Sequence, residues 1–113
     1  MSTTAYISIG SNIGDRAGNL REAVGKMREL GRVTATSSLY ETEPVEFTEQ
    51  PWFLNGAVTL ETDLAPKELL AGLLGIERAM GRERAQLKGP RVIDLDIVLF
   101  GEQVVDEPTL KIP

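Results

Sequence analysis

Residues 92–100, Val-Ile-Asp-Leu-Asp-Ile-Val-Leu-Phe, are apolar except for two aspartates, and this pattern predicts a central β-strand. Side chains alternate between the two faces of a strand, so Asp94 and Asp96 are expected on one face. The opposite face, expected to pack under helices, carries Ile93, Leu95, Ile97 and Leu99. Carboxylates two residues apart lie about 6–7 Å from each other and repel by roughly 2–3 kcal/mol at an effective dielectric of about 20. Hard divalent cations such as Mg²⁺ would relieve that repulsion.

A solvated acidic sheet face is the alternative reading of these two aspartates. The preceding loop favours an anionic ligand instead, because it carries Arg82, Arg84, Lys88 and Arg91. Gly89-Pro90 fixes a turn directly before the strand. Such cations could merely neutralise the carboxylates, but cations and metal ligands beside an open sheet face fit a polyphosphate better.

Outward from this strand, the remaining elements follow from hydrophobic periodicity. Strands are expected at residues 5–9, 33–40 and 53–61, helices at about 15–31 and 66–81, and a short hairpin after Gly101. The helices should bury Leu20, Ala23, Val24, Met27 and Leu30, and then Leu69, Leu73, Ile76 and Met80. The order β-α-β-β-α-β predicts an α+β fold of the ferredoxin-like, split βαββαβ type. Two helices would cover one face of an antiparallel sheet, with a short terminal β-ribbon, in a single domain spanning residues 1–113.

Composition excludes several kinds of chemistry. The 113 residues contain no Cys and no His, which rules out disulfides, thiolate or imidazole zinc sites and His-dependent triads within this sequence. The formal net charge of −5 disfavours nucleic-acid binding. No apolar run is long enough for a membrane span, and no secretory signal is apparent, so a cytoplasmic location is the default expectation.

Several segments together resemble the 6-hydroxymethyl-7,8-dihydropterin pyrophosphokinase family of the folate pathway. The most specific is Lys88-Gly89-Pro90-Arg91-Val92-Ile93-Asp94-Leu95-Asp96-Ile97-Val98. Others in matching order are Ile9-Gly10-Ser11-Asn12, Tyr40-Glu41-Thr42-Glu43-Pro44, Gln50-Pro51-Trp52-Phe53-Leu54-Asn55, Ile76-Glu77 and Gly81-Arg82, then Arg84. The resemblance covers essentially the whole sequence. It implies transfer of pyrophosphate from ATP to the hydroxymethyl group of the pterin, with release of AMP.

The resemblance also implies roles around the ATP. Asp94 and Asp96 would hold two Mg²⁺ ions, and Arg82 and Arg91 would bind phosphates and stabilise the departing charge. The loop over ATP would be closed by Arg84, and Glu77 and Ile97 would lie by the nucleotide. The loop arginines could instead be solvated, and Glu77 could be an exposed carboxylate paired with an arginine.

On the pterin side, the resemblance implies contacts from Thr42, Pro44, Val45, Phe53 and Asn55. The Asn55 amide offers a donor and an acceptor for the edge of the ring, and Phe53 could stack on its face. Trp52 and Lys88 receive no role. Around Gly10, Asn12 and Gly14, Walker spacing is absent, so a helix-capping turn is expected rather than a phosphate loop.

The sequence stops at Lys111-Ile112-Pro113, whereas the family continues, so the domain is expected to be C-terminally incomplete. Three alternatives stay open. The chain could be a truncated or non-catalytic ferredoxin-like module that binds a small molecule, or a nuclease or phosphodiesterase using Asp94 and Asp96. An RNA-binding sheet is disfavoured by the acidic balance and the 5% aromatic content. The expected partners are ATP and a dihydropterin alcohol, without nucleic acid or membrane, for a monomer or weak dimer.

Overall fold

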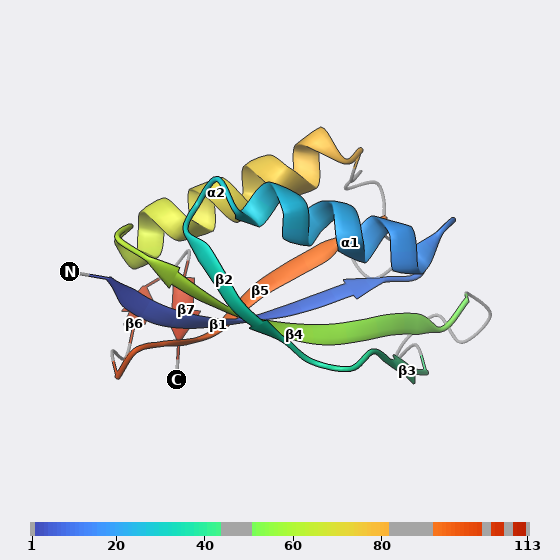
Figure 1. Cartoon of the computed structure of the whole chain (residues 1–113), viewed down its shortest axis with the longest axis horizontal. Coiled ribbons are helices and arrows are strands. Elements are labelled where there is room, and N and C mark those ends of the chain that lie inside the picture. Colours follow the sequence, from blue (N-terminus) through green and yellow to red (C-terminus); the bar gives the residue numbers. More distant parts are fainter. Residues whose placement is uncertain (1, 44–50, 82–91, 103–104, 108–109, 113) are drawn as a thin grey trace.

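Figure 1 shows the computed structural model of the chain, which describes residues 2–43, 51–81, 92–102, 105–107 and 110–112. Its elements are β1 (Thr3–Ser11), α1 (Arg16–Met27), β2 (Arg32–Thr36), β3 (Tyr40–Thr42), β4 (Phe53–Thr62), α2 (Pro66–Ala79), β5 (Asp94–Phe100), β6 (Val105–Glu107) and β7 (Leu110–Ile112). The main sheet has the order β2-β4-β1-β5, with β3 also paired to β4, and the strand pairs of this sheet in the described residues are antiparallel. A separate pair joins β6 to β7. The expected α+β class and antiparallel sheet are confirmed.

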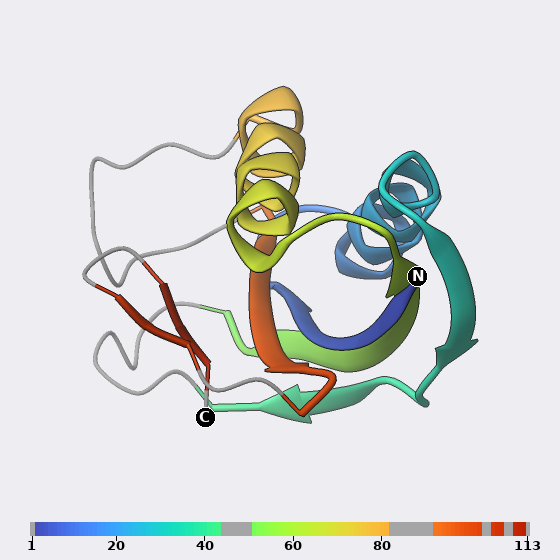
Figure 2. The same cartoon turned by 90° about the vertical axis from the view of Figure 1, so that its left-hand side faces the viewer.

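Both helices lie on the same side of the main sheet, as Figures 1 and 2 show. The core between them is formed by the predicted stripes: Leu20, Ala23 and Met27 of α1 and Leu69, Leu73 and Ile76 of α2 are all buried. From the sheet, the core receives Ala5, Ile7, Ile9, Val58, Leu60, Leu95, Ile97 and Phe100. The other face of the sheet is therefore covered by neither of these two helices.

The helix boundaries follow local capping chemistry. Asp15 accepts a hydrogen bond from the Gly18 N–H at 3.0 Å and starts α1, as its residue type predicts. Pro66 opens α2, and Gly81 with a φ of +85° follows its end. α1 ends earlier than the expected Gly31, because residues 28–30 bond to carbonyls three residues back, as in a tightened last turn. Neither described helix has the length and apolar character that a membrane crossing requires.

The predicted strand 33–40 is divided into β2 and β3. Between the two strands, the Ser37 hydroxyl accepts a hydrogen bond from the Ala57 N–H at 2.8 Å, while the Ser37 N–H donates to the Ala57 carbonyl at 2.8 Å. A side-chain oxygen thus occupies the place of a ladder carbonyl, which interrupts regular pairing.

Two expectations about residues 92–100 are wrong. Within the described part of the chain, β5 lies at the edge of the sheet rather than at its centre. Leu99 is 40% exposed, and Phe100 is buried in its place. The reason is a register shift: Ile97 pairs with Ile7 but Leu99 pairs with Tyr6, so Val98 is an extra residue that reverses the alternation of the faces.

Candidate functional site

The open face of the sheet carries two rows of aligned residues across three strands. In the first row, Gly10 of β1 pairs with Asn55 of β4 on one side and with Asp94 of β5 on the other. Directly paired residues project to the same face, and neighbouring strands lie about 4.8 Å apart. The Cα atoms of Asn55 and Asp94 are therefore roughly 10 Å apart, with only a glycine between them.

The second row places Ser8 between Ala57 and Asp96. Asp94 is half-buried and Asp96 is exposed. Leu95 and Ile97, which alternate with them, are only 7% and 4% exposed and belong to the core. The prediction that both aspartates lie on the face away from the helices is confirmed.

The two carboxylates influence each other electrostatically. Partial burial against the sheet raises the pKa of Asp96 above its ordinary value of 3.8, and the nearby charge of Asp94 raises it further. A hydrogen bond from the Ile97 backbone acts in the opposite direction. The ionised form of Asp96 is thus disfavoured, first by burial and then by the second acid on the same strand face.

This donor set fits magnesium. Among the residues that the structure describes, no group of three or more acidic, His or Cys side chains gathers to form a metal cage. Magnesium usually takes one or two carboxylates and completes its shell with water and substrate phosphates. The pair Asp94 and Asp96 therefore matches a magnesium–polyphosphate site better than an all-protein metal centre.

Glu77 lies on the other side of β5. It sits in the last part of α2, is only 2% exposed, and accepts a hydrogen bond from the Leu95 N–H at 2.9 Å through Oε2. The alternative expectation of an exposed Glu77 carboxylate is wrong. Since Leu95 stands between the two aspartates, this buried carboxylate contacts the backbone that carries them.

Gly10 was expected in a capping turn, but it lies inside β1. A Cβ at this position would lie 3.0 Å from the Asn55 Oδ1 and 3.6 Å from the Phe53 Cδ1. The Asn55 amide is held by a 2.7 Å hydrogen bond to the Thr42 hydroxyl and a 3.4 Å bond to the Phe53 carbonyl. A glycine within a strand is a known signal of close approach, and here it makes room for the Asn55 side chain of β4.

The structure brings together Thr42, Phe53, Asn55, Asp94 and Asp96 on or beside the open face. Ile97 is buried, so only its backbone remains for contact with a nucleotide. The predicted site residues Arg82, Arg84, Arg91, Pro44 and Val45 lie outside the described residues, as does Lys88. Trp52, which received no role, is 49% exposed.

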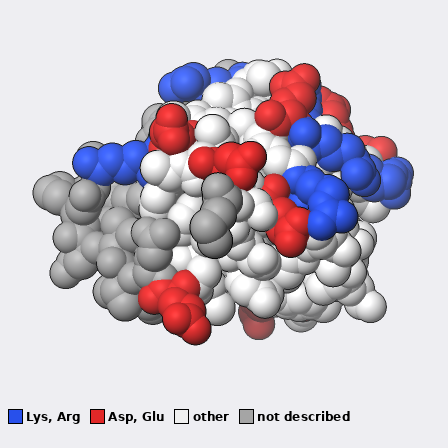
Figure 3. Space-filling view, turned by 60° about the vertical axis from the view of Figure 1, so that its left-hand side comes forward, with Lys and Arg blue, Asp and Glu red and all other residues white. Residues whose placement is uncertain are grey.

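Two surface features lie apart from this face. A cavity of about 400 Å³ opens between α1 and the β2–β3 region, lined by Leu20, Arg21, Arg28, Ser37 and Leu39 among others, and it includes neither aspartate nor Asn55. In Figure 3, acidic side chains lie between the basic ones, and the described residues of that view form no broad basic area.

The comparisons with known proteins point to one family. The family model for 7,8-dihydro-6-hydroxymethylpterin-pyrophosphokinase (HPPK) matches residues 6–113. A Bacillus subtilis protein named 2-amino-4-hydroxy-6-hydroxymethyldihydropteridine pyrophosphokinase is 46% identical over 115 residues, which cover 100% of this chain and 69% of that protein. The mitochondrial folate synthesis bifunctional protein of Pisum sativum is 49% identical over 108 residues, which cover 95% of this chain. This chain spans only 21% of the length of the pea protein.

Solved structures agree on the fold. The wild-type Plasmodium falciparum HPPK-DHPS, crystallised with pterin and p-hydroxybenzoate, superposes with a TM-score of 0.71 over 93% of this chain and 29% of that one, at 20% identity. Its A437G variant with pteroate gives a TM-score of 0.70 at 18% identity, over 93% of this chain and 29% of that one. At such identities the likeness establishes the arrangement of the elements.

Proposed function

Because the chain belongs to the 7,8-dihydro-6-hydroxymethylpterin-pyrophosphokinase family, we propose that it transfers pyrophosphate from ATP to the hydroxymethyl group of 6-hydroxymethyl-7,8-dihydropterin and releases AMP. The observation that carries this proposal is the row Asn55–Gly10–Asp94 across three strands. It supports a substrate that spans the open face, with its ring over β4 and its reacting end over β5.

The pterin ring is assigned to the β4 side of the face. The Asn55 amide offers both a donor and an acceptor to the ring edge, and its bond to the Thr42 hydroxyl fixes its orientation. Phe53 contributes an aromatic face at the same end of β4. Pro44 and Val45 complete the proposed pterin contacts.

The triphosphate is assigned to the β5 side. Asp94 and Asp96 would hold two magnesium ions, which when bound neutralise phosphate charge and polarise the reacting oxygens. Arg82, Arg84 and Arg91 would bind the phosphates, and the Ile97 backbone would lie by the nucleotide.

The reaction forms one bond and breaks one bond. The pterin hydroxyl oxygen attacks the β-phosphorus of ATP in line, the bond from that phosphorus to the oxygen of the α-phosphate breaks, and the hydroxyl proton is released. The residues of the chain bind and orient both substrates, because phosphoryl transfer depends mainly on positioning and charge stabilisation.

We also propose that the chain has the ferredoxin-like split arrangement with a terminal β-ribbon. The strand order β2-β4-β1-β5 supports the ferredoxin-like split, and the pairing of β6 with β7 supports a terminal ribbon. The single pyrophosphokinase domain, the cytoplasmic location and the monomer or weak dimer stay predictions.

The test is AMP formation from ATP and Mg²⁺ with and without the dihydropterin alcohol. We expect AMP only when ATP, Mg²⁺ and the pterin are all present, and none with EDTA. Hydrolysis of ATP without the pterin would instead indicate a phosphodiesterase. Pterin binding that needs no magnesium and yields no AMP would indicate a binding module.

Gly10→Ala is expected to raise the KM for the pterin by about tenfold with little change in the KM for ATP. The added methyl group would stand 3.0 Å from the Asn55 Oδ1, so the amide would have to move by a few tenths of an ångström from its present position. Steady-state kinetics with each substrate varied in turn measures the effect. Gly25→Ala, in α1 where a Cβ meets nothing within 4 Å, is the matched control and should leave both constants unchanged.

A further inference from the structure

Arg16 stands at an unfavourable place for a cation. It is the first residue of α1, directly after the Asp15 cap, and the first turn of this helix contains no acidic residue. The positive end of the helix dipole disfavours a positive charge there. Helix stability therefore does not explain why an arginine stands at position 16. Its contacts with other elements explain it.

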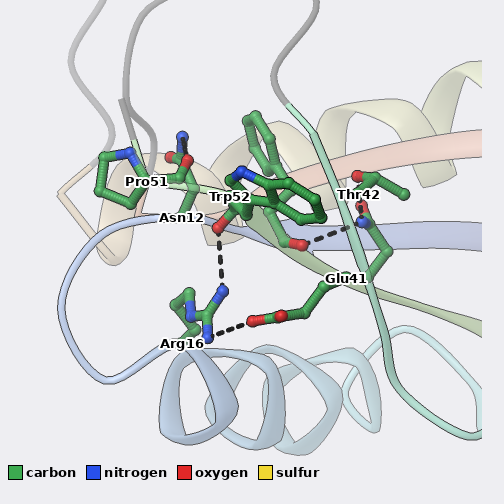
Figure 4. A network of polar contacts seen from close by, with 8 residues as sticks. Asn12, Arg16, Glu41, Thr42, Pro51 and Trp52 are labelled. Carbon is green, nitrogen blue, oxygen red and sulfur yellow. Dashed lines mark hydrogen bonds and ion pairs between the residues drawn. The ribbon is translucent and has the colours of Figure 1, made fainter. Parts of the chain in front are cut away.

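The Arg16 guanidinium contacts two separate segments, as Figure 4 shows. Its Nη2 lies 2.7 Å from the Glu41 Oε1 in β3. Its Nη1 donates a 2.9 Å hydrogen bond to the Trp52 carbonyl, directly before β4. One planar group thus ties β3 and the approach to β4 to the start of α1.

Neighbouring contacts reinforce this connection. Asn12 is 1% exposed and donates through Nδ2 to the Pro51 carbonyl at 3.1 Å. Asn12 and Arg16 thus hold two consecutive carbonyls before β4. Asn19 braces that turn with hydrogen bonds to the Ser11 hydroxyl at 3.1 Å and the Ile13 carbonyl at 2.8 Å.

The held segments carry the proposed pterin contacts. Glu41 pairs with Leu54, and Thr42 pairs with Phe53, so β3 lies against the first residues of β4. At this junction the Thr42 hydroxyl accepts a hydrogen bond from the Asn55 side-chain amide. A shift of β3 or of residues 51–52 would therefore change the orientation of Asn55 and Phe53.

On the basis of the proposed function, we infer that Arg16 is a positioning residue for the pterin subsite, acting through Glu41 and the Trp52 carbonyl. The chain offers a matched control. Arg32 and Glu61 form an ion pair between β2 and β4, but at the opposite end of β4 from Asn55. The Arg32 side chain is 75% exposed, against 31% for Arg16, whereas Glu61 is 34% exposed, against 51% for Glu41. The Arg32–Glu61 pair is thus partly solvated, and exposed pairs contribute little.

The experiment compares Arg16→Glu, Glu41→Arg and the double exchange with the control exchange Arg32→Glu/Glu61→Arg. Arg16→Glu should raise the KM for the pterin by about tenfold, with kcat and the KM for ATP within about twofold of wild type. The double exchange should restore the ion pair but not the bond to the Trp52 carbonyl, because a carboxylate cannot donate, so rescue should be partial. The control exchange should leave the pterin KM unchanged.

Trp52 provides a readout that does not depend on turnover. It is the single tryptophan of the chain and is half-exposed. Arg16→Glu should shift its emission, the control exchange should not, and quenching by the pterin should give Kd values that follow the KM values.

The outcomes separate the two proposals. An active wild type whose pterin KM and Trp52 emission are unaffected by Arg16→Glu overturns the role of Arg16 alone. An equal loss toward both substrates in Arg16→Glu also overturns it, since that indicates general destabilisation. A wild type that neither binds the pterin nor forms AMP overturns the proposed function and this inference together.

Discussion

Asp94→Asn and Asp96→Asn should each lower AMP formation by at least about 10²–10³-fold, the usual scale for losing one preorganised electrostatic group. Asparagine keeps the shape of aspartate but removes the negative charge that a magnesium ion requires. Both substitutions lie on the open face, away from the helix-packed core. Measured initial rates at saturating ATP and pterin, with magnesium varied, test the expectation, and full turnover in both single variants would contradict the metal assignment.

The fold should survive Asp96→Asn, and the direction of the Asp96 pKa explains why. A folded-state pKa above the unfolded value means that the native protein binds this proton more tightly. The resulting stabilisation is present below the unfolded pKa and is lost as pH rises through the raised folded value. At neutral pH, Asp96→Asn therefore removes a disfavoured charge, and without magnesium its thermal midpoint should be no lower than that of wild type.

A magnesium titration with a non-hydrolysable ATP analogue completes the comparison. Wild type should gain thermal stability on binding, because the ligand selects the folded state. The two Asn variants should gain little at the same concentrations. An equal gain in all three proteins would show that the nucleotide binds without these carboxylates.

The sequence predicted best those features that depend only on the two-residue alternation of side chains along one strand. Leu95 and Ile97 entered the core, and the intervening Asp94 and Asp96 stayed outside, as a period of two requires. The apolar stripes of both helices were also readable, because burial of a helix face imposes a spacing that the sequence must follow.

Features set by contacts between distant segments were not readable. The bulge at Val98 arises from the register of β5 against β1. The residue types at positions 92–100 do not predict it. Ser37 interrupts its strand only because the Ala57 N–H is opposite. The need for a glycine at position 10 comes from the close approach of Asn55, which lies more than forty positions later in the chain.

Arg16 shows the same limit for the candidate site. The first turn of a helix favours negative side chains, so an arginine there is an exception. Such an exception indicates that the residue has contacts outside its helix, but it does not identify the partners. Its partners Glu41 and Trp52 become neighbours only once β3 and β4 have paired.

Glu77→Ala should lower the free energy of unfolding by about 1–3 kcal/mol, because it leaves the buried Leu95 N–H without this acceptor. For a domain of this size each kcal/mol corresponds to about 4–8 °C in Tm. Thermal unfolding followed by circular dichroism measures the loss. Glu68→Ala, an exposed carboxylate that bonds the Ala65 N–H at the start of the same helix, is a control for removing a helix-terminal contact and should cost less.

Glu77→Gln distinguishes a structural acceptor from a group that meets the nucleotide through its charge. The amide oxygen of glutamine can still accept from the Leu95 N–H, so the thermal midpoint should fall less than in Glu77→Ala. Because Leu95 lies between Asp94 and Asp96, a retained bond should also keep both carboxylates in place, and the magnesium dependence of turnover should stay near that of wild type. A Gln variant that is as stable as wild type but has a strongly raised KM for ATP would favour direct contact between the Glu77 charge and the nucleotide site.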